Sequence, residues 1–311
     1  MARASSIVAC LVLLLTAAAL APAPGVALTP SQVKVAVLNS TAEPGYGYGA
    51  SLHNKYADVV SMLAGFGFQA QAITNGEIEA GALANFHVLL LIDNWPSEGA
   101  VPKIKSFWQN RGGLVVFDSS ICLLCYAGIL PAASEGSHGH DVYWDYIIDG
   151  DEGIKIATSH PVTAGYSVGT VLTPSQYALD DAAYIETAML GQPEWPYITV
   201  LARYVPDENM IASLAYAPPD KGRVVFIWCD DVTDEAINTL VKNAVLWAAE
   251  PKFQPAPGPG PGFFIDPMLL LLIIVVVVVI VVVVVAVVLA RRRRAPPAPA
   301  YPCLLYTSDA A

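Results

Sequence analysis

The sequence predicts an α/β domain with a doubly wound, mostly parallel sheet, joined to one C-terminal transmembrane helix. In the first half of the chain, short runs that are apolar throughout alternate with segments of helical spacing. This pattern is typical of parallel strands that are covered on both faces. The transmembrane helix is predicted by an uninterrupted run of 23 uncharged residues, 268–290, which are almost all Val, Ile and Leu.

The individual elements follow from the spacing of apolar residues. The predicted strands of the first half are residues 33–38, 68–73, 88–92 and 114–117, and the predicted helices are residues 51–63, 101–109 and 119–127. In the second half, shorter runs with turns between them predict an antiparallel extension at residues 154–157, 176–178, 197–203 and 210–215. A buried strand at 224–228 and an amphipathic helix at 234–249 then close the domain.

The two ends of the chain predict export and a single membrane crossing. Arg3 precedes an apolar run, and the small residues up to Ala27 fit a signal-cleavage site. Arg291 to Arg294 directly follow the long apolar run, which places the C-terminus in the cytoplasm. The predicted parts are a signal peptide, an extracytoplasmic domain, a Pro- and Gly-rich tether, a helix in the lipid bilayer and a short cytoplasmic tail, at residues 1–27, 28–252, 253–267, 268–290 and 291–311. The end of the tail, residues 303–311, resembles translated sequencing-adapter sequence.

The exported part of the chain is strongly acidic. Of 27 acidic residues only Asp309 lies outside residues 28–267, and of 16 basic residues Arg3 and Arg291–Arg294 lie outside, which leaves a net charge near −15. This charge argues against binding to nucleic acid or docking on anionic lipid, and it favours solubility or cationic partners.

The exported part holds three cysteines, an odd number that does not indicate a disulfide framework. Cys122 and Cys125 form a CxxC pair, which could bridge or take part in redox chemistry in an oxidising compartment. Their apolar surroundings suit two small buried thiols equally well.

Four segments carry a resemblance to a known family. These are Gly112 to Ser119 (GGLVVFDS), His160 to Gly165 (HPVTAG), Lys221 to Phe226 (KGRVVF) and Asn243 to Ala248 (NAVLWA). In this order and spacing they resemble class I glutamine amidotransferase-like domains, and the trehalose-utilisation-like branch most closely. The resemblance implies a flavodoxin-like, amidotransferase-like fold across nearly all of the exported domain.

The chain departs from that family where the chemistry would occur. The family's strand-to-helix elbow holds a nucleophilic Cys, or His in the trehalose-utilisation-like branch, but here the matching residue is Asp118. The family's Gly-His after the closing strand is Cys229-Asp230 here, and no matching His and Glu pair accompanies the elbow. These departures argue against nucleophilic amide hydrolysis.

Ligands of open α/β sheets bind at the carboxyl ends of the strands, so residues there are the first site candidates. They are Asn39, Asp93, Asn94, Trp95, Asp118, Ser119, Ser120 and Asp230. If the three carboxylates meet in one pocket, they could hold a divalent cation such as Ca²⁺ or Mg²⁺, or the hydroxyls of a sugar. The alternative is helix capping, in which Asp and Ser satisfy free main-chain N–H groups.

Two further clusters lie in Gly-rich segments. His138, His140 and Asp141 could ligate a metal ion, with a solvated loop as the alternative. Tyr46 and Tyr48 offer aromatic faces for sugar stacking, with a surface loop as the alternative.

Three classes of function remain open. The favoured one is a non-catalytic extracytoplasmic domain that binds a small molecule, a carbohydrate or a partner protein. The second is a carbohydrate-active enzyme that uses Asp118 or His140 as acid–base groups. The third is a component of a transport-associated membrane complex.

Overall fold

The computed structural model describes residues 28–40, 55–92, 94–118, 120–130, 143–146, 153–175, 181–186, 196–229 and 231–254. The chain divides into two compact units, Met1–Ala256 and Pro257–Ala311, and the described residues all belong to the first. Within the described ranges, no helix combines the length and the apolar character needed to cross a bilayer. The predicted signal peptide and the apolar run 268–290 lie outside these ranges.

Nine of the described strands form a mixed sheet in the order β2-β1-β3-β4-β11-β10-β9-β6-β7, and β8 pairs with β10 and with β5 off this path. The first five strands of this order are mutually parallel, and those from β10 onward are antiparallel. The strands of the parallel part are β1 (Lys34–Asn39), β2 (Gln69–Thr74), β3 (Val88–Ile92), β4 (Gly113–Phe117) and β11 (Val224–Ile227). Those of the extension are β6 (Ile154–Ile156), β7 (Val171–Leu172), β9 (Ile198–Tyr204) and β10 (Met210–Tyr216). The mostly parallel sheet with an antiparallel extension is therefore confirmed.

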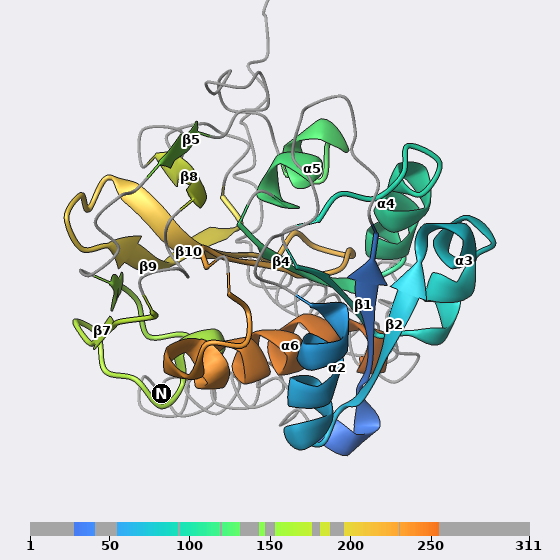
Figure 1. Ribbon diagram of the computed structural model, residues 1–311, viewed down its shortest axis with the longest axis horizontal. Coiled ribbons are helices and arrows are strands. Elements are labelled where there is room, and N and C mark those ends of the chain that lie inside the picture. Colours follow the sequence, from blue (N-terminus) through green and yellow to red (C-terminus); the bar gives the residue numbers. More distant parts are fainter. Residues whose placement is uncertain are drawn as a thin grey trace, which may run out of the picture. The chain divides into compact units, whose positions relative to one another are not determined.

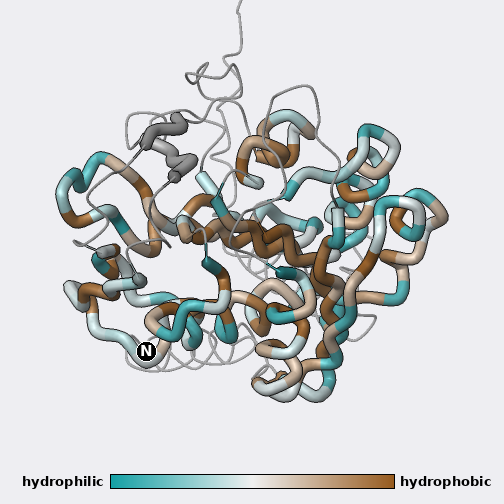
Figure 2. The backbone as a smooth tube through the Cα atoms, viewed as in Figure 1, coloured by the Kyte–Doolittle hydropathy of each residue, from teal (hydrophilic) through white to brown (hydrophobic). Residues whose placement is uncertain are grey.

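Helices cover both faces of the parallel part. α2 (Tyr56–Gly65) and α6 (Asn238–Phe253) lie on one side, and α4 (Val101–Gln109) and α5 (Ser120–Tyr126) lie on the other (Figure 1). The middle strands are consequently shielded from water on both faces, and every residue of β3 and β4 is buried. Figure 2 shows the result as a hydrophobic band through the centre of the domain. Continuous apolar runs are the sequence pattern that such strands require.

Several elements differ from the prediction or were missed by it. The last helix does not begin at Asp234, because that carboxylate accepts a hydrogen bond from Ala236 N (2.8 Å) and starts a short 3₁₀ turn instead. α6 then runs through Phe253, one residue past the predicted end of the domain. The elements that the sequence did not predict are α3 (Asn75–Glu79), β5 (Tyr143–Tyr146), β7 and β8 (Asp181–Glu186). The predicted strand 176–178 lies outside the described residues.

The segment that begins at His160 ties the extension to α6. The His160 main-chain N donates to Thr163 Oγ1 (2.9 Å), and its imidazole Nδ1 accepts from Val162 N (3.2 Å). Asn243 of α6 donates its amide to the carbonyl oxygens of Val162 and Ala164. This motif of the family resemblance is thus explained by structural contacts.

We expect the domain to lose stability as the pH falls from 7.5 to 5, because two histidines, His87 and His160, become protonated. Burial, and next a neighbouring cation, hold the pKa of His160 and of His87 below the usual 6.5. In each, Nδ1 accepts a main-chain N–H, which protonation would abolish. A folded-state pKa below the unfolded value means that the stability is fully present above pH 6.5 and is lost as the pH falls through that value toward the folded pKa.

The measurement is the free energy of unfolding in urea at pH 7.5 and at pH 5. The double variant His87→Gln, His160→Gln should show a smaller loss over this interval than the wild type. An equal loss in both proteins would contradict the assignment. The two carboxyl groups with lowered pKa values, Glu77 and Glu208, titrate below this interval and do not obscure the comparison.

Candidate functional site

Three neighbouring parallel strands end at the same level of the sheet. In the ladder, Ile92 of β3 and Ile227 of β11 both pair with Phe117, the last residue of β4. Adjacent strands lie about 4.8 Å apart, so the ends of these three strands lie side by side. We call this edge, formed by the residues that follow β1, β3, β4 and β11, the carboxyl edge.

Asp118 lies at the centre of the carboxyl edge, directly after β4. Its backbone has φ 41°, a left-handed conformation that is uncommon for any residue other than glycine. Its side chain is only 2% exposed. Main-chain bonds hold the residue on both sides, because Asp118 N donates to Ile227 O (3.3 Å) and Ile121 N donates to Asp118 O (3.1 Å). The elbow predicted at this position is therefore a sharp strand-to-helix turn that leads into α5.

Asn94 and Ser120 brace the elbow from the side of β3. Asn94 Nδ2 donates to Leu38 O (2.8 Å) and its Oδ1 accepts from Ile92 N (3.3 Å), which ties β1 to β3. The Ser120 hydroxyl donates to Asn94 O (3.2 Å). Both side chains are buried, so their described contacts are structural.

Trp95 was predicted as a ligand-binding residue, but its side chain is 3% exposed and is part of the hydrophobic core. Its carbonyl oxygen accepts a hydrogen bond from Ser40 Oγ (2.6 Å), and its ring lies 6.4 Å from that of Tyr126. In this conformation the indole offers no open face for a sugar. Asn39, at the end of β1, is half-buried.

A second polar chain extends from this point along the edge, and the sequence had not indicated it. Asn75 Nδ2 donates to Ser40 Oγ (2.7 Å), and Asn75 Oδ1 accepts from Ser97 N (3.0 Å). Ser97 Oγ then donates to Glu79 Oε1 (2.6 Å). The sequence pattern that could have predicted α3, and with it the position of Asn75, is the capping box of this helix. In it, Thr74 and Glu77 satisfy one another's main-chain N–H groups.

The acids after β11 act as caps within the described residues. Asp231 Oδ1 accepts from both the main-chain N and the hydroxyl of Thr233, and Asp234 accepts from Ser175 N as well as Ala236 N. Cys229 is fully buried, and its Sγ lies 3.2 Å from Asp231 O. Asp234 thus caps a 3₁₀ turn, and Asp231 stabilises a local turn. Neither is one of Asp93, Asp118 and Asp230, for which capping was the predicted alternative to a shared site.

Several predicted site residues lie outside the described residues. They are Tyr46, Tyr48, Asp93, Ser119, His138, His140, Asp141 and Asp230. Among the residues that are described, no group of three or more His, Cys, Asp or Glu side chains could hold a metal ion. The described cysteines, including Cys122 and Cys125, are not joined by a disulfide.

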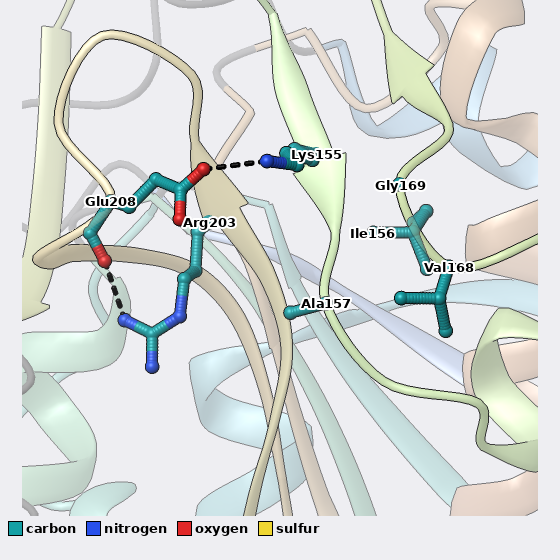
Figure 3. Close-up of a pocket in the computed structure, with 7 residues that line it drawn as sticks. All are labelled: Lys155, Ile156, Ala157, Val168, Gly169, Arg203 and Glu208. Carbon is teal, nitrogen blue, oxygen red and sulfur yellow. Dashed lines mark hydrogen bonds and ion pairs between the residues drawn. The ribbon is translucent and has the colours of Figure 1, made fainter.

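A pocket of about 270 Å³ lies in the antiparallel extension (Figure 3). Lys155 of β6 and Arg203 of β9 both contact Glu208 there, through Lys155 Nζ to Glu208 Oε1 (2.6 Å) and Arg203 Nη1 to Glu208 O (2.6 Å). Apolar side chains of Ile156, Ala157 and Val168 complete the lining. Because the Lys155–Glu208 pair is largely exposed to solvent, it contributes little to stability.

No protein-family model matches the chain, and no curated protein matches it. Among solved structures, it is similar to a putative ThuA-like protein from Bacteroides uniformis (13% identity, TM-score 0.45, 73% of this chain and 95% of that one). It is also similar to a putative GMP synthase component from Thermoplasma acidophilum (9%, 0.44, 71% and 97%) and to PurLQS from Thermotoga maritima (14%, 0.43, 73% and 100%). Likenesses this distant carry no conclusion about activity or ligand, so the function has to be argued from the residues of the site.

Proposed function

We propose that this chain is a membrane-anchored, extracytoplasmic binding domain on an amidotransferase-like scaffold, with its ligand held at the carboxyl edge around Asp118. The observation that carries the proposal is Asp118 itself, a buried carboxylate in a left-handed backbone conformation at the tip of a central strand. Such strained non-glycine residues cost roughly 1–3 kcal/mol and cluster at functional sites. The carboxyl ends of parallel strands are also the usual ligand position in open α/β sheets.

The replacement at the elbow favours binding over catalysis. An Asp at this position cannot act as the thiol nucleophile of the amidotransferase reaction. Cys122 belongs to the helix after the elbow and is fully buried, so it does not substitute for that nucleophile. The export signal, the Pro- and Gly-rich tether and the apolar run 268–290 support a domain presented at the cell surface.

The second candidate is a carbohydrate-active enzyme, and Asp118 is again the residue that favours it. A buried carboxyl group at a sheet edge is suited to general acid–base chemistry on a glycoside. A role as a component of a transport-associated complex rests on the predicted membrane helix alone.

The experiment uses residues 28–254, which contain the hydrophobic core of the described part of the chain, from Val33 to Ala249. We expect saturable binding to one member of a panel of sugars, amides and glycosides, without turnover. Asp118→Asn should weaken this binding by about tenfold or more, since a hydrogen bond to a charged group contributes about 1.5–3 kcal/mol.

Asp220→Asn is the matched control. Asp220 is also an aspartate with positive φ (62°), but it is exposed and lies before β11, at the opposite end of the strands. Turnover that Asp118→Asn abolishes and Asp220→Asn preserves would establish the enzyme instead. Equal affinity in the wild type and Asp118→Asn would remove Asp118 from the site.

A further inference from the structure

The amino ends of the parallel strands are basic, although the domain as a whole is acidic. The segments that enter these strands, together with the end of α6, are residues 28–34, 64–69, 85–88, 109–113, 217–224 and 249–254. They hold two acids, Asp220 and Glu250, and five bases, which we call the basic pole: Lys34, Arg111, Lys221, Arg223 and Lys252. The net charge of these segments is +3. Because residues 28–267 carry about −15 in total, the remainder of this region carries about −18.

Direct contacts hold the basic pole around the last turn of α4 and the end of α6. Arg111 Nη1 donates to Gln254 O (3.1 Å). Lys221 Nζ lies 4.6 Å from the ring centre of Trp108, and Lys252 Nζ lies 5.2 Å from that of Phe107. Aromatic faces therefore fix two of the cations in place without neutralising them.

The remaining two bases differ in how far they are neutralised. Arg223 stacks on Trp247 and pairs with Glu250 (2.5 Å), so it adds little net charge. Lys34 is exposed at the start of β1, and its main-chain N donates to His87 Nδ1 (2.9 Å). Lys34 and Lys252 both lower the pKa of His87, after the larger effect of burial. An anionic surface would reduce the electrostatic repulsion between these basic side chains.

The described part of the chain ends at the basic pole, directly before the predicted tether and membrane helix. α6 ends at Phe253, whose side chain is 40% exposed and whose ring lies 4.5 Å from that of His87. The Pro- and Gly-rich tether follows directly. The carboxyl edge lies at the other end of the strands, where a five-residue strand spans roughly 17 Å. That distance is about two Debye lengths at physiological salt, so the acids of the carboxyl edge are largely screened from a surface that contacts the pole.

We propose that the basic pole docks on the anionic lipid headgroups of the membrane to which the chain is anchored, so that the carboxyl edge points away from the bilayer. The inference rests on the membrane anchoring proposed above and adds an orientation to it. The net charge of the exported part argues against contact with anionic lipid, but only the charge within a Debye length of the surface decides the contact. Each basic side chain near an anionic surface strengthens binding by about fivefold.

The test uses the full chain with vesicles of phosphatidylcholine alone and with vesicles that also contain phosphatidylglycerol. Flotation under alkaline conditions reports anchoring, which should be the same for both lipids. Hydrogen exchange reports docking, and residues 28–34, 109–113, 217–224 and 249–254 should exchange about fivefold more slowly or better on the anionic vesicles only. Raising the salt to high ionic strength should remove this protection.

The variant Lys34→Gln, Arg111→Gln, Lys221→Gln should lose the protection and keep the flotation. Its matched control, Lys55→Gln, Lys103→Gln, Lys242→Gln, removes the same charge outside the basic pole and should keep both. Equal exchange on the two kinds of vesicle, or equal loss in the control, would overturn the docking. A chain that does not float would instead refute the anchoring, while its exchange with anionic vesicles would still decide whether the pole binds them. Protection by an acidic protein but not by lipid would also refute the proposal.

Discussion

Replacing Gly222 with alanine is expected to unfold the domain or to cost at least about 3 kcal/mol of stability. A Cβ atom at Gly222 would overlap the main-chain oxygen of Gly112 and lie 2.7 Å from its carbonyl carbon. Both glycines belong to segments that enter neighbouring strands, and Gly222 N donates to Trp108 O (2.7 Å). No rotamer can relieve a clash between two main chains, so β4 and β11 would have to separate where they meet.

The measurement is urea unfolding of the Gly222→Ala variant, followed by circular dichroism. Gly76→Ala is the control, because a Cβ at this helical position meets nothing within 4 Å. The control should be neutral or should gain up to about 1 kcal/mol, since alanine restricts the unfolded chain more than glycine does. A Gly222→Ala protein as stable as the control would show that the two segments do not approach so closely.

Ca²⁺ or Mg²⁺ is expected to stabilise the domain by about 2.7 kcal/mol at a hundredfold excess over Kd. For a domain of this size, that corresponds to a rise of roughly 5–10 °C in Tm. The reason is the common level at which β3, β4 and β11 end, since in the sequence Asp93 and Asp118 directly follow β3 and β4, and Asp230 comes three residues after β11. We expect the three carboxylates to meet at this edge, where close carboxylates recruit a cation.

The comparison that decides this prediction is Tm with Ca²⁺ against Tm with EDTA, for the wild type and two variants. Asp118→Asn should abolish the cation effect, and Asp220→Asn should preserve it. If the wild-type Tm responds to neither Ca²⁺ nor EDTA, capping remains the sufficient explanation for the carboxylates. Asp234, which accepts a hydrogen bond from Ala236 N at the start of a 3₁₀ turn, is a described example of such a cap.

The candidate site shows where sequence patterns lose information. Asp118 could be predicted as a site residue because it stands where the family that the segment resembles holds a nucleophile. Its left-handed backbone conformation could not be predicted from the sequence. Asn94 and Trp95 stand beside it at a strand end, yet their side chains brace strands and fill the core. Position at a strand end follows from sequence, whereas the direction of a side chain depends on packing against distant segments. The polar chain through Asn75 and Ser97 was missed for the same reason.

The sequence by itself determined the α/β class, the parallel strands and most of the helices. Strands that are buried on both faces must be apolar throughout, so β3 and β4 could be predicted from continuous runs of apolar residues in the sequence. A strand as short as β7 was not, because its two residues, Val171 and Leu172, are too few to form a recognisable pattern. Only the tertiary structure decided the strand order, the common level of the strand ends and the gathering of five bases at one pole. These features depend on contacts between residues distant in sequence, which a local pattern does not record.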